Sequence, residues 1–246
     1  MKMPAKRRLI IVLGLLLVAT VAISASLLTR NGNFTPQMAG EPDSSDVGAV
    51  EAIASLYRLY PLFTDPDRRV DMTLQQRQQA EVEFHSLLNI IPLELLLPQM
   101  EKYSIASAEI VRSFENPRGF VNRVAEVAMN GIITPESYQK PAHGQVNFRK
   151  KIALGENSRL FSASNKTIFA LFDTSAYSDT RVLVKWYHAP TGRIILFKQF
   201  EISDGDSNHI WIYDENGFDN GDYKVEVYRV NPALPLLTSG SYRIEN

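Results

Sequence analysis

The chain has 246 residues, of which 45% are hydrophobic and 22% are charged, the balance of an ordinary globular protein with one or two domains. Its formal net charge of −1 gives no electrostatic basis for nucleic-acid binding, which requires a basic face or stripe. With 0 cysteines, the sequence excludes disulfides, thiolate metal sites, a cysteine nucleophile and lipid attachment through cysteine.

The N-terminus predicts export across a membrane. Residues 1–8 are basic and carry no acid, whereas residues 9–28 carry no charge at all. A helix of this length spans about 30 Å, the thickness of a hydrocarbon core. We therefore expect a cytoplasmic tail at 1–8, a transmembrane anchor in the lipid bilayer at 9–28, and a periplasmic location for the rest of the chain. The alternative is a cleaved signal peptide, with an apolar region at 9–23 and small residues near Ser24 for cleavage.

A flexible linker is expected at residues 29–46, which are rich in Gly, Pro, Asn, Ser and Asp. Residues 47–133 then predict a small helical domain. Asp46 can cap its first helix, for which the three-four spacing predicts a buried face of Val50, Ile53, Ala54, Tyr57 and Tyr60. Thr73 and Gln76 fit a capping box that opens a second helix, with a predicted buried side of Leu74, Ala80, Phe84, Leu87 and Leu88.

The rest of the helical domain is interrupted by prolines. Pro92 and Pro98 are expected to divide their stretch into short turns, because proline suits a first helical position and not an interior. Residues 89–100 are apolar enough for the centre of the core, with a partner-binding groove as the alternative. Asn116 begins the clearest helix, which Asn130 and Gly131 are expected to end in a left-handed turn. Its predicted buried face consists of Phe120, Val121, Val124, Val127 and Ala128.

After a second polar linker at residues 134–143, the hydrophobic period changes to two. Residues 144–246 contain runs of strand type at 145–154, 167–173, 181–188, 193–202, 209–213, 223–230 and 239–245. Short alternating strands at such close spacing predict a two-sheet β-sandwich. The expected fold class is therefore α+β and multidomain, with a transmembrane helix, a small α-helical domain and a C-terminal sandwich.

Several residues of this region follow a known pattern. Trp186 lies in one strand, Ile210-x-Ile212 in a later one, and Asp219-x-Gly221-x-Tyr223-x-Val225 leads into the next. This pattern resembles the immunoglobulin-like sandwich. The resemblance implies that Trp186 lies in the core and that Asp219, Gly221 and Tyr223 form a corner, in which the tyrosine hydroxyl bonds back to the preceding loop.

The resemblance covers residues 144–246 and concerns the fold alone. Val225 stands at the place of the second family cysteine, and residues 168–172 cover the region of the first. The disulfide of that family is therefore absent. No family resemblance is identified for the helical part.

The acidic stretch around residues 204–222 has two interpretations. Asp204, Asp206, Asn208 and Glu215 match ligand positions of a helix-loop-helix calcium site. His209, however, stands where that loop needs glycine, and the residues after it are of strand type. Asp, Asn and Gly favour tight turns for conformational reasons, so we expect turns and neither a metal nor a cofactor.

No catalytic constellation is found, and we do not expect an enzyme. The histidines at 85, 143, 188 and 209 lack the HxH or HxxxH spacing of zinc ligands, although His188 and His209 could meet at one end of a sandwich. No serine lies in a G-x-S-x-G elbow, and no glycine cluster fits a phosphate. A flat sandwich also offers no cleft for paired carboxylates.

Aromatic residues supply the candidate interaction surface, for which we select Trp211, Tyr213 and Tyr187. If Ile210 and Ile212 point inward, Trp211 and Tyr213 must point outward. Aromatic side chains on an open sheet face serve protein contact or sugar stacking. The alternative places Trp211 in the core and the isoleucines outside.

Together these features predict a non-enzymatic, single-pass protein of the bacterial inner membrane. Its periplasmic region would bind other envelope proteins as a component or assembly factor of a larger complex. One alternative is an exported carbohydrate- or ligand-binding module with a cleaved signal peptide. Another is a membrane-tethered regulator, although residues 1–8 leave little room for a cytoplasmic effector.

Overall fold

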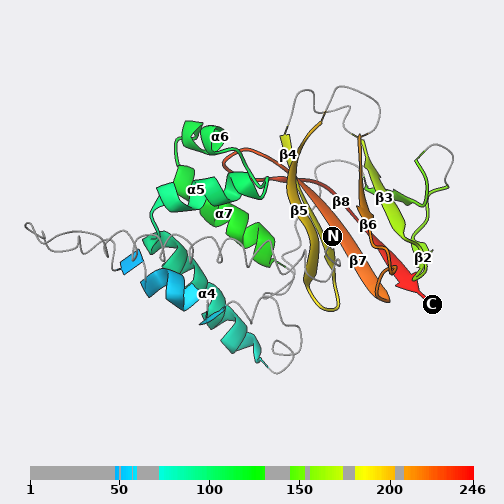
Figure 1. Cartoon of the computed structure of the whole chain (residues 1–246), viewed down its shortest axis with the longest axis horizontal. Helices are drawn as coiled ribbons and strands as arrows, with labels where there is room; N and C mark the ends of the chain where they lie inside the picture. Colours follow the sequence, from blue (N-terminus) through cyan, green and yellow to red (C-terminus); the bar gives the residue numbers. More distant parts are fainter. Residues whose placement is uncertain are drawn as a thin grey trace, which may run out of the picture.

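The computed structural model describes residues 48–49, 51–56, 58–59, 72–130, 145–152, 156–173, 181–202 and 208–246. These residues form a mixed α+β fold of several helices and two β-sheets (Figure 1). The predicted tail at 1–8, the anchor at 9–28 and the linkers at 29–46 and 134–143 lie outside the described residues. No helix within the described ranges combines the length and the hydrophobicity needed to cross a membrane.

The helical region begins with helical residues at 48–49, 51–56 and 58–59. It continues through α4 (Leu74–Ile90), α5 (Leu93–Lys102), α6 (Ala108–Ser113) and α7 (Pro117–Met129). The predicted capping box of α4 is confirmed. Gln76 N donates to Thr73 Oγ1 at 3.2 Å, and Thr73 N donates to Gln76 Oε1 at 2.8 Å. At the start of α7, Gly119 N donates to Asn116 Oδ1 at 2.8 Å, so both helices begin where their capping residues predict.

The predicted buried faces agree with the structure only in part. The α7 prediction is confirmed for all its residues, and Met129 is buried as well. In α4, Ala80, Phe84 and Leu88 are buried, but Leu74 is exposed because it is the first helical residue and the buried positions begin further along. In the first helix the buried residues include Ala52, Ile53 and Leu56, so the face is rotated away from the exposed Ala54. Val50, Tyr57 and Tyr60 lie outside the described residues.

The expectation that Pro98 starts a new turn is wrong. Pro98 lies inside α5, and Pro92 is the N-cap of that helix. An interior proline costs about 3 kcal/mol. Burial of Leu96, Leu97 and Met100, each at most 2% exposed, contributes about 1.5–3 kcal/mol per side chain. Packing therefore outweighs the lost hydrogen bond, and the apolar stretch around α5 forms part of a buried core.

The C-terminal region contains two sheets. Their strands are β1 (Asn147–Arg149), β2 (Leu160–Ser162), β3 (Thr167–Phe172), β4 (Arg181–His188), β5 (Arg193–Glu201), β6 (Asn208–Tyr213), β7 (Gly221–Arg229) and β8 (Leu236–Glu245). One sheet has the order β1-β3-β6 and the other β2-β8-β7-β4-β5. Strand β2 was not predicted, because its 3 residues are too few to show a period, and it pairs in parallel with β8.

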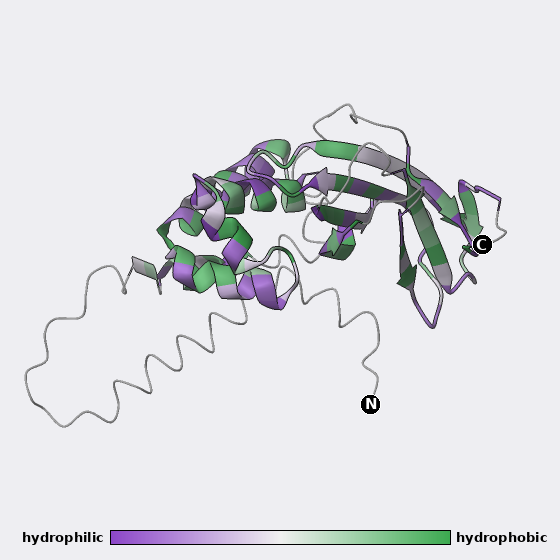
Figure 2. Ribbon diagram, turned by 90° about the horizontal axis from the view of Figure 1, so that it is seen from above, coloured by the Kyte–Doolittle hydropathy of each residue, from purple (hydrophilic) through white to green (hydrophobic). Residues whose placement is uncertain are grey.

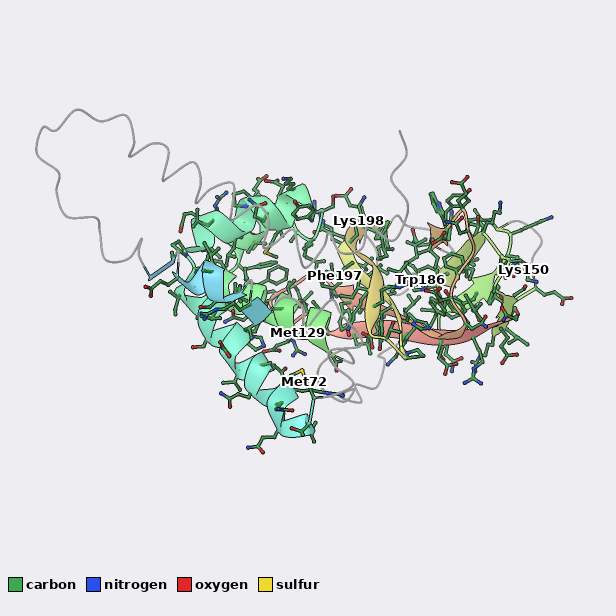
Figure 3. All side chains as sticks on the ribbon, turned by 60° about the horizontal axis from the view of Figure 1, so that its bottom comes forward. Met72, Met129, Lys150, Trp186, Phe197 and Lys198 are labelled. Atoms are coloured by element: carbon green, nitrogen blue, oxygen red, sulfur yellow. The ribbon has the colours of Figure 1, made fainter. Side chains whose placement is uncertain are left out.

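The two sheets face each other across an apolar core, which confirms the two-layer β-sandwich. Trp186, Tyr223 and Val225 are fully buried there. Trp186 Nε1 donates to Tyr242 Oη at 3.0 Å, so the polar atom of the indole is satisfied inside the core. Figure 3 shows Trp186 among the side chains between the sheets.

The helices cover the outer face of the five-stranded sheet. Figure 1 shows α5 and α7 on one side of β4 and β5, with β3 and β6 on the other side. Side chains of both regions form one continuous buried cluster, to which the sheet contributes Leu183, Tyr187, Phe197, Tyr228 and Leu236. Hydrophobic and hydrophilic residues alternate along both kinds of element (Figure 2), as expected for helices and strands that each bury one face. The helical region and the sandwich therefore share a core.

A buried lysine joins the two regions. Lys185 on β4 is fully buried, and its Nζ donates to the carbonyl oxygen of Val127 at 2.9 Å and to that of Asn130. The same Nζ lies 4.5 Å from the ring centre of Tyr187 and 4.0 Å from Glu226 Oε2. We call this group the Lys185 junction.

The Lys185 junction explains how α7 ends. The last carbonyls of a helix have no partner within the helix and carry partial negative charge. Here an ammonium group from the sheet binds them, so no left-handed turn is needed at Asn130, whose φ of −56° and ψ of 132° are extended. The predicted left-handed stop is therefore wrong for Asn130, and Gly131 lies outside the described residues.

Candidate functional site

The outer face of the three-stranded sheet carries exposed aromatic side chains. Ile210 and Ile212 are buried, whereas Trp211 is 58% exposed and Tyr213 60% exposed. The alternative that placed Trp211 in the core is therefore wrong, because β6 alternates with its isoleucines inward. In the register of β3 with β6, Phe169 lies opposite Trp211. We call the outward residues of these two strands the aromatic face, which consists of Thr167, Phe169, Leu171, His209, Trp211 and Tyr213.

The rings of the aromatic face contact one another. The ring centres of Phe169 and Trp211 lie 6.4 Å apart, and those of His209 and Trp211 lie 6.2 Å apart in a stacked arrangement. Trp211 thus has a ring neighbour along its own strand and one on the adjacent strand, which restrict its rotamers. An aromatic side chain that is held in place and still exposed suits binding, because little conformational entropy is lost when a partner covers it.

Tyr187, the third predicted residue of the interaction surface, is not part of it. Its side chain is 1% exposed and belongs to the core shared with the helices. Tyr187 lies on β4, which belongs to the five-stranded sheet. From the alternation of residues along β4, the face that carries Tyr187 was expected to be exposed, but the helices cover it. The structure therefore brings Trp211 and Tyr213 together and separates them from Tyr187.

The corner predicted from the resemblance has a definite geometry. Tyr223 Oη donates to the carbonyl oxygen of Asp219 at 2.7 Å, and burial raises the pKa of Tyr223 to about 12. The Asp219 carboxylate pairs with Arg193 at 2.8 Å. Gly221 has φ of 138°, and a Cβ there would lie 2.3 Å from His188 Nε2, so this position requires glycine. The group has a structural role, because its polar atoms bond within the corner.

His188 is a buried side chain of the same corner. Its Nε2 lies 3.1 Å from the carbonyl oxygen of Asn220, and its Nδ1 lies 2.7 Å from Thr191 Oγ1. Because a carbonyl only accepts, Nε2 carries the proton and Nδ1 accepts from the threonine hydroxyl. His188 contacts the ring of Tyr223, whereas His209 stacks on Trp211 of the other sheet, so these histidines do not form a pair.

The stability of the protein is expected to fall in mild acid because of His188. Burial lowers the pKa of His188, an effect that the Asn220 carbonyl, Asp219 and Asp222 oppose and that Arg193 reinforces. The pKa of a histidine in the unfolded chain is about 6.5. As the pH falls below this value, His188 becomes protonated in the unfolded chain but stays neutral in the folded chain, so the free energy of unfolding decreases. In His188→Gln, an amide can still donate to Asn220 but does not titrate. Urea unfolding between about pH 7 and 5 should show a smaller loss in the variant. Parallel curves would contradict this assignment.

The acidic stretch forms a turn where the structure describes it. Asn216 N donates to the Asp214 carboxylate at 3.0 Å, Gly217 N donates to the Asp214 carbonyl at 3.2 Å, and Gly217 has a positive φ. In this kind of turn, the side chain and the carbonyl of an aspartate accept hydrogen bonds from the backbone N–H groups of the residues that follow it. Among the described residues, no group of three or more metal-binding side chains comes together. Asp204 and Asp206 lie outside the described residues.

A groove of about 650 Å³ lies over the outer face of β7 and β8, and sequence reasoning missed it. Among its charged groups, Arg243 pairs with Asp222 at 2.6 Å and Lys224 with Glu226 at 3.1 Å, and Arg159 donates to the amide oxygen of Gln145 at 2.7 Å. The signal for this face was the alternation of Asp222, Lys224 and Glu226 between buried residues of β7. Because these groups already have partners within the protein, the groove does not indicate a particular class of ligand. It is therefore a weaker candidate for the functional site than the aromatic face.

Comparison of the chain with models of protein families gives no match, and comparison with curated proteins gives none.

Proposed function

We propose that this chain is a non-enzymatic, single-pass protein of the bacterial inner membrane, and that its periplasmic region binds other envelope proteins. It acts as a component or assembly factor of a larger complex. The uncharged segment at 9–28, behind a basic tail at 1–8, supports the membrane location and the orientation. A tether of this kind confines the folded part near the membrane and raises its effective concentration for a neighbouring partner.

The observation that carries the proposal is the exposed aromatic face. Trp211 and Tyr213 are each more than half exposed on an open sheet, next to Phe169 and Leu171. Tryptophan and tyrosine are enriched at the centres of protein interfaces, because they bury a large area at a low cost in side-chain entropy. A partner that covers these rings gains this burial without reorganising the sheet.

We also propose that the sandwich is immunoglobulin-like. The orders β1-β3-β6 and β2-β8-β7-β4-β5 fit that fold, with Trp186 on the buried strand β4 and the Tyr223 hydroxyl bonded back to Asp219. Val225, which stands at the place of the second family cysteine, is the register partner of Trp186, and both lie in the buried core. Domains of this shape commonly serve as binding modules, but the shape alone defines no partner.

Carbohydrate binding is the second candidate, and the exposure of Trp211 is the observation that favours it. A sugar ring can stack on an indole, but it also needs polar side chains around the ring to bond its hydroxyls. The aromatic face offers a sugar the hydroxyls of Thr167 and Tyr213 and the ring of His209, but no charged or amide side chain, and this balance favours a protein partner. Glycan binding that is lost in Trp211→Ala would support the sugar instead.

Mild crosslinking in intact cells, followed by purification of the full-length chain, tests the proposal. We expect one stoichiometric complex that contains other envelope proteins. Recovery of this chain without any such protein would contradict a role as a component or assembly factor of an envelope complex.

A further inference from the structure

The free edge of β6 is the least protected strand edge in the described part of the chain. The sheet orders leave β1, β6, β2 and β5 at the edges. Strands β1 and β2 have only 3 residues each. Strand β5 carries Arg193, Lys198 and Glu201, and its Gln199 N donates to the Ser104 carbonyl of the helical region at 2.6 Å. Strand β6, with the sequence NHIWIY, has no acidic or basic side chain apart from its histidine, and no proline. Charges and proline are the usual protection of an edge against strand pairing, and β6 lacks them.

The backbone groups that face this free edge can be assigned. Asp214 N donates to the Lys166 carbonyl at 3.0 Å, so Asp214 directs its backbone groups toward β3. The direction of the backbone groups alternates from one residue to the next along an antiparallel strand. The backbone N–H and C=O groups of Ile212 and Ile210 therefore also point toward β3. The N–H and C=O groups of His209, Trp211 and Tyr213 therefore point to the free edge.

We propose that the partner at this edge is a second copy of the chain, which pairs antiparallel with β6 about a two-fold axis at Trp211. In this register Trp211 lies opposite Trp211, and His209 lies opposite Tyr213 of the other copy. The N–H and C=O groups of His209, Trp211 and Tyr213 then all have partners on the other copy. Each pair of opposed residues exchanges two hydrogen bonds, one from each N–H to the opposite C=O. Moving the register by two residues leaves some of these groups without a partner in the strand. Moving it by one residue turns the isoleucines toward solvent.

The side chains agree with this register. Ile210 pairs with Ile212 on the buried face, and the aromatic rings of both copies meet on the exposed face, where Trp211 and Tyr213 are otherwise 58% and 60% exposed. No like charges oppose each other along Asn208–Tyr213. The pairing joins two aromatic faces into one continuous surface. The inference thus rests on the proposed role of this face in protein contact and names its first partner.

Single-cysteine variants of the full chain in its native membrane test the register, because the natural sequence has 0 cysteines. In the proposed pair, the Cα atoms of opposed residues lie about 5.5 Å apart, within the range of a disulfide. Trp211→Cys should therefore give a disulfide-linked dimer under mild oxidation, at least about tenfold more than Val82→Cys, an equally exposed position on α4.

A second pair of variants keeps Trp211 and distinguishes specific pairing from random collision. His209→Cys and Tyr213→Cys, coexpressed with different tags, should form a mixed dimer. Each alone should form little, because identical positions then lie about 13 Å apart along the strands. Equal yields from all combinations would overturn the proposal, and so would a Trp211→Cys chain that stays monomeric. A Trp211→Cys adduct with a different protein would overturn self-pairing while leaving the proposed function intact.

Discussion

Replacing Lys185 with methionine is expected to lower the free energy of unfolding by roughly 3–5 kcal/mol. Lys185 is fully buried, and its Nζ binds the carbonyls of Val127 and Asn130 at the end of α7. The variant leaves these carbonyls without their donor and removes the buried positive charge that lies 4.0 Å from Glu226. Glu226 keeps Tyr228 Oη at 2.8 Å and Lys224 at 3.1 Å, which moderates the loss. Urea unfolding followed by circular dichroism measures the change.

Lys198 provides the matched control for this prediction. It is an exposed lysine on the neighbouring strand β5, and Lys198→Met should change stability by at most about 0.5 kcal/mol. The double variant Lys185→Met with Glu226→Gln removes both charges and should recover part of the loss, since the buried carboxylate that has lost one of its two neighbouring cations is then replaced by a neutral amide. If Lys185→Met is as stable as the natural chain, the junction does not hold α7 on the sheet.

Replacing Trp211 with alanine is expected to lower the affinity for the partner captured by crosslinking roughly 30-fold. Trp211 is 58% exposed at the centre of the aromatic face, next to Phe169 and His209, so its truncation removes the largest apolar area that a partner can bury. Because so much of the side chain lies in solvent, stability should change by no more than about 1 kcal/mol. Binding of the purified full chain in detergent to the isolated partner measures the affinity.

Val82→Ala is the control for general surface changes, because Val82 is 64% exposed on α4, away from the aromatic face. It should leave binding unchanged. An unchanged affinity in Trp211→Ala would show that partners bind elsewhere. The aromatic face would then lose its role in the proposed function.

Local patterns predicted much of the fold because the deciding interactions are local. The capping box at Thr73, the cap at Asn116 and the buried face of α7 depend on residues within a few positions of one another. The outward direction of Trp211 and Tyr213 likewise follows from alternation with two isoleucines on the same strand.

The errors have a common physical origin in contacts between distant parts of the chain. Lys185 and Tyr187 alternate as surface residues of a strand, yet the helices cover that face of the sheet and bury both. Pro98 remains inside a helix because the surrounding side chains are packed in the shared core. Strand β2 forms only because β8 offers it an edge. None of these contacts leaves a periodic signal in the sequence.

Reporter fusions after Asn246 test most directly whether the folded part of this chain is exported. A phosphatase that is active only outside the cytoplasm should show high activity when fused there, and a fluorescent protein that matures only in the cytoplasm should remain dark. The opposite result is an inactive phosphatase fusion together with a fluorescent protein fusion that is bright. It would place the aromatic face in the cytoplasm and contradict a role in the envelope.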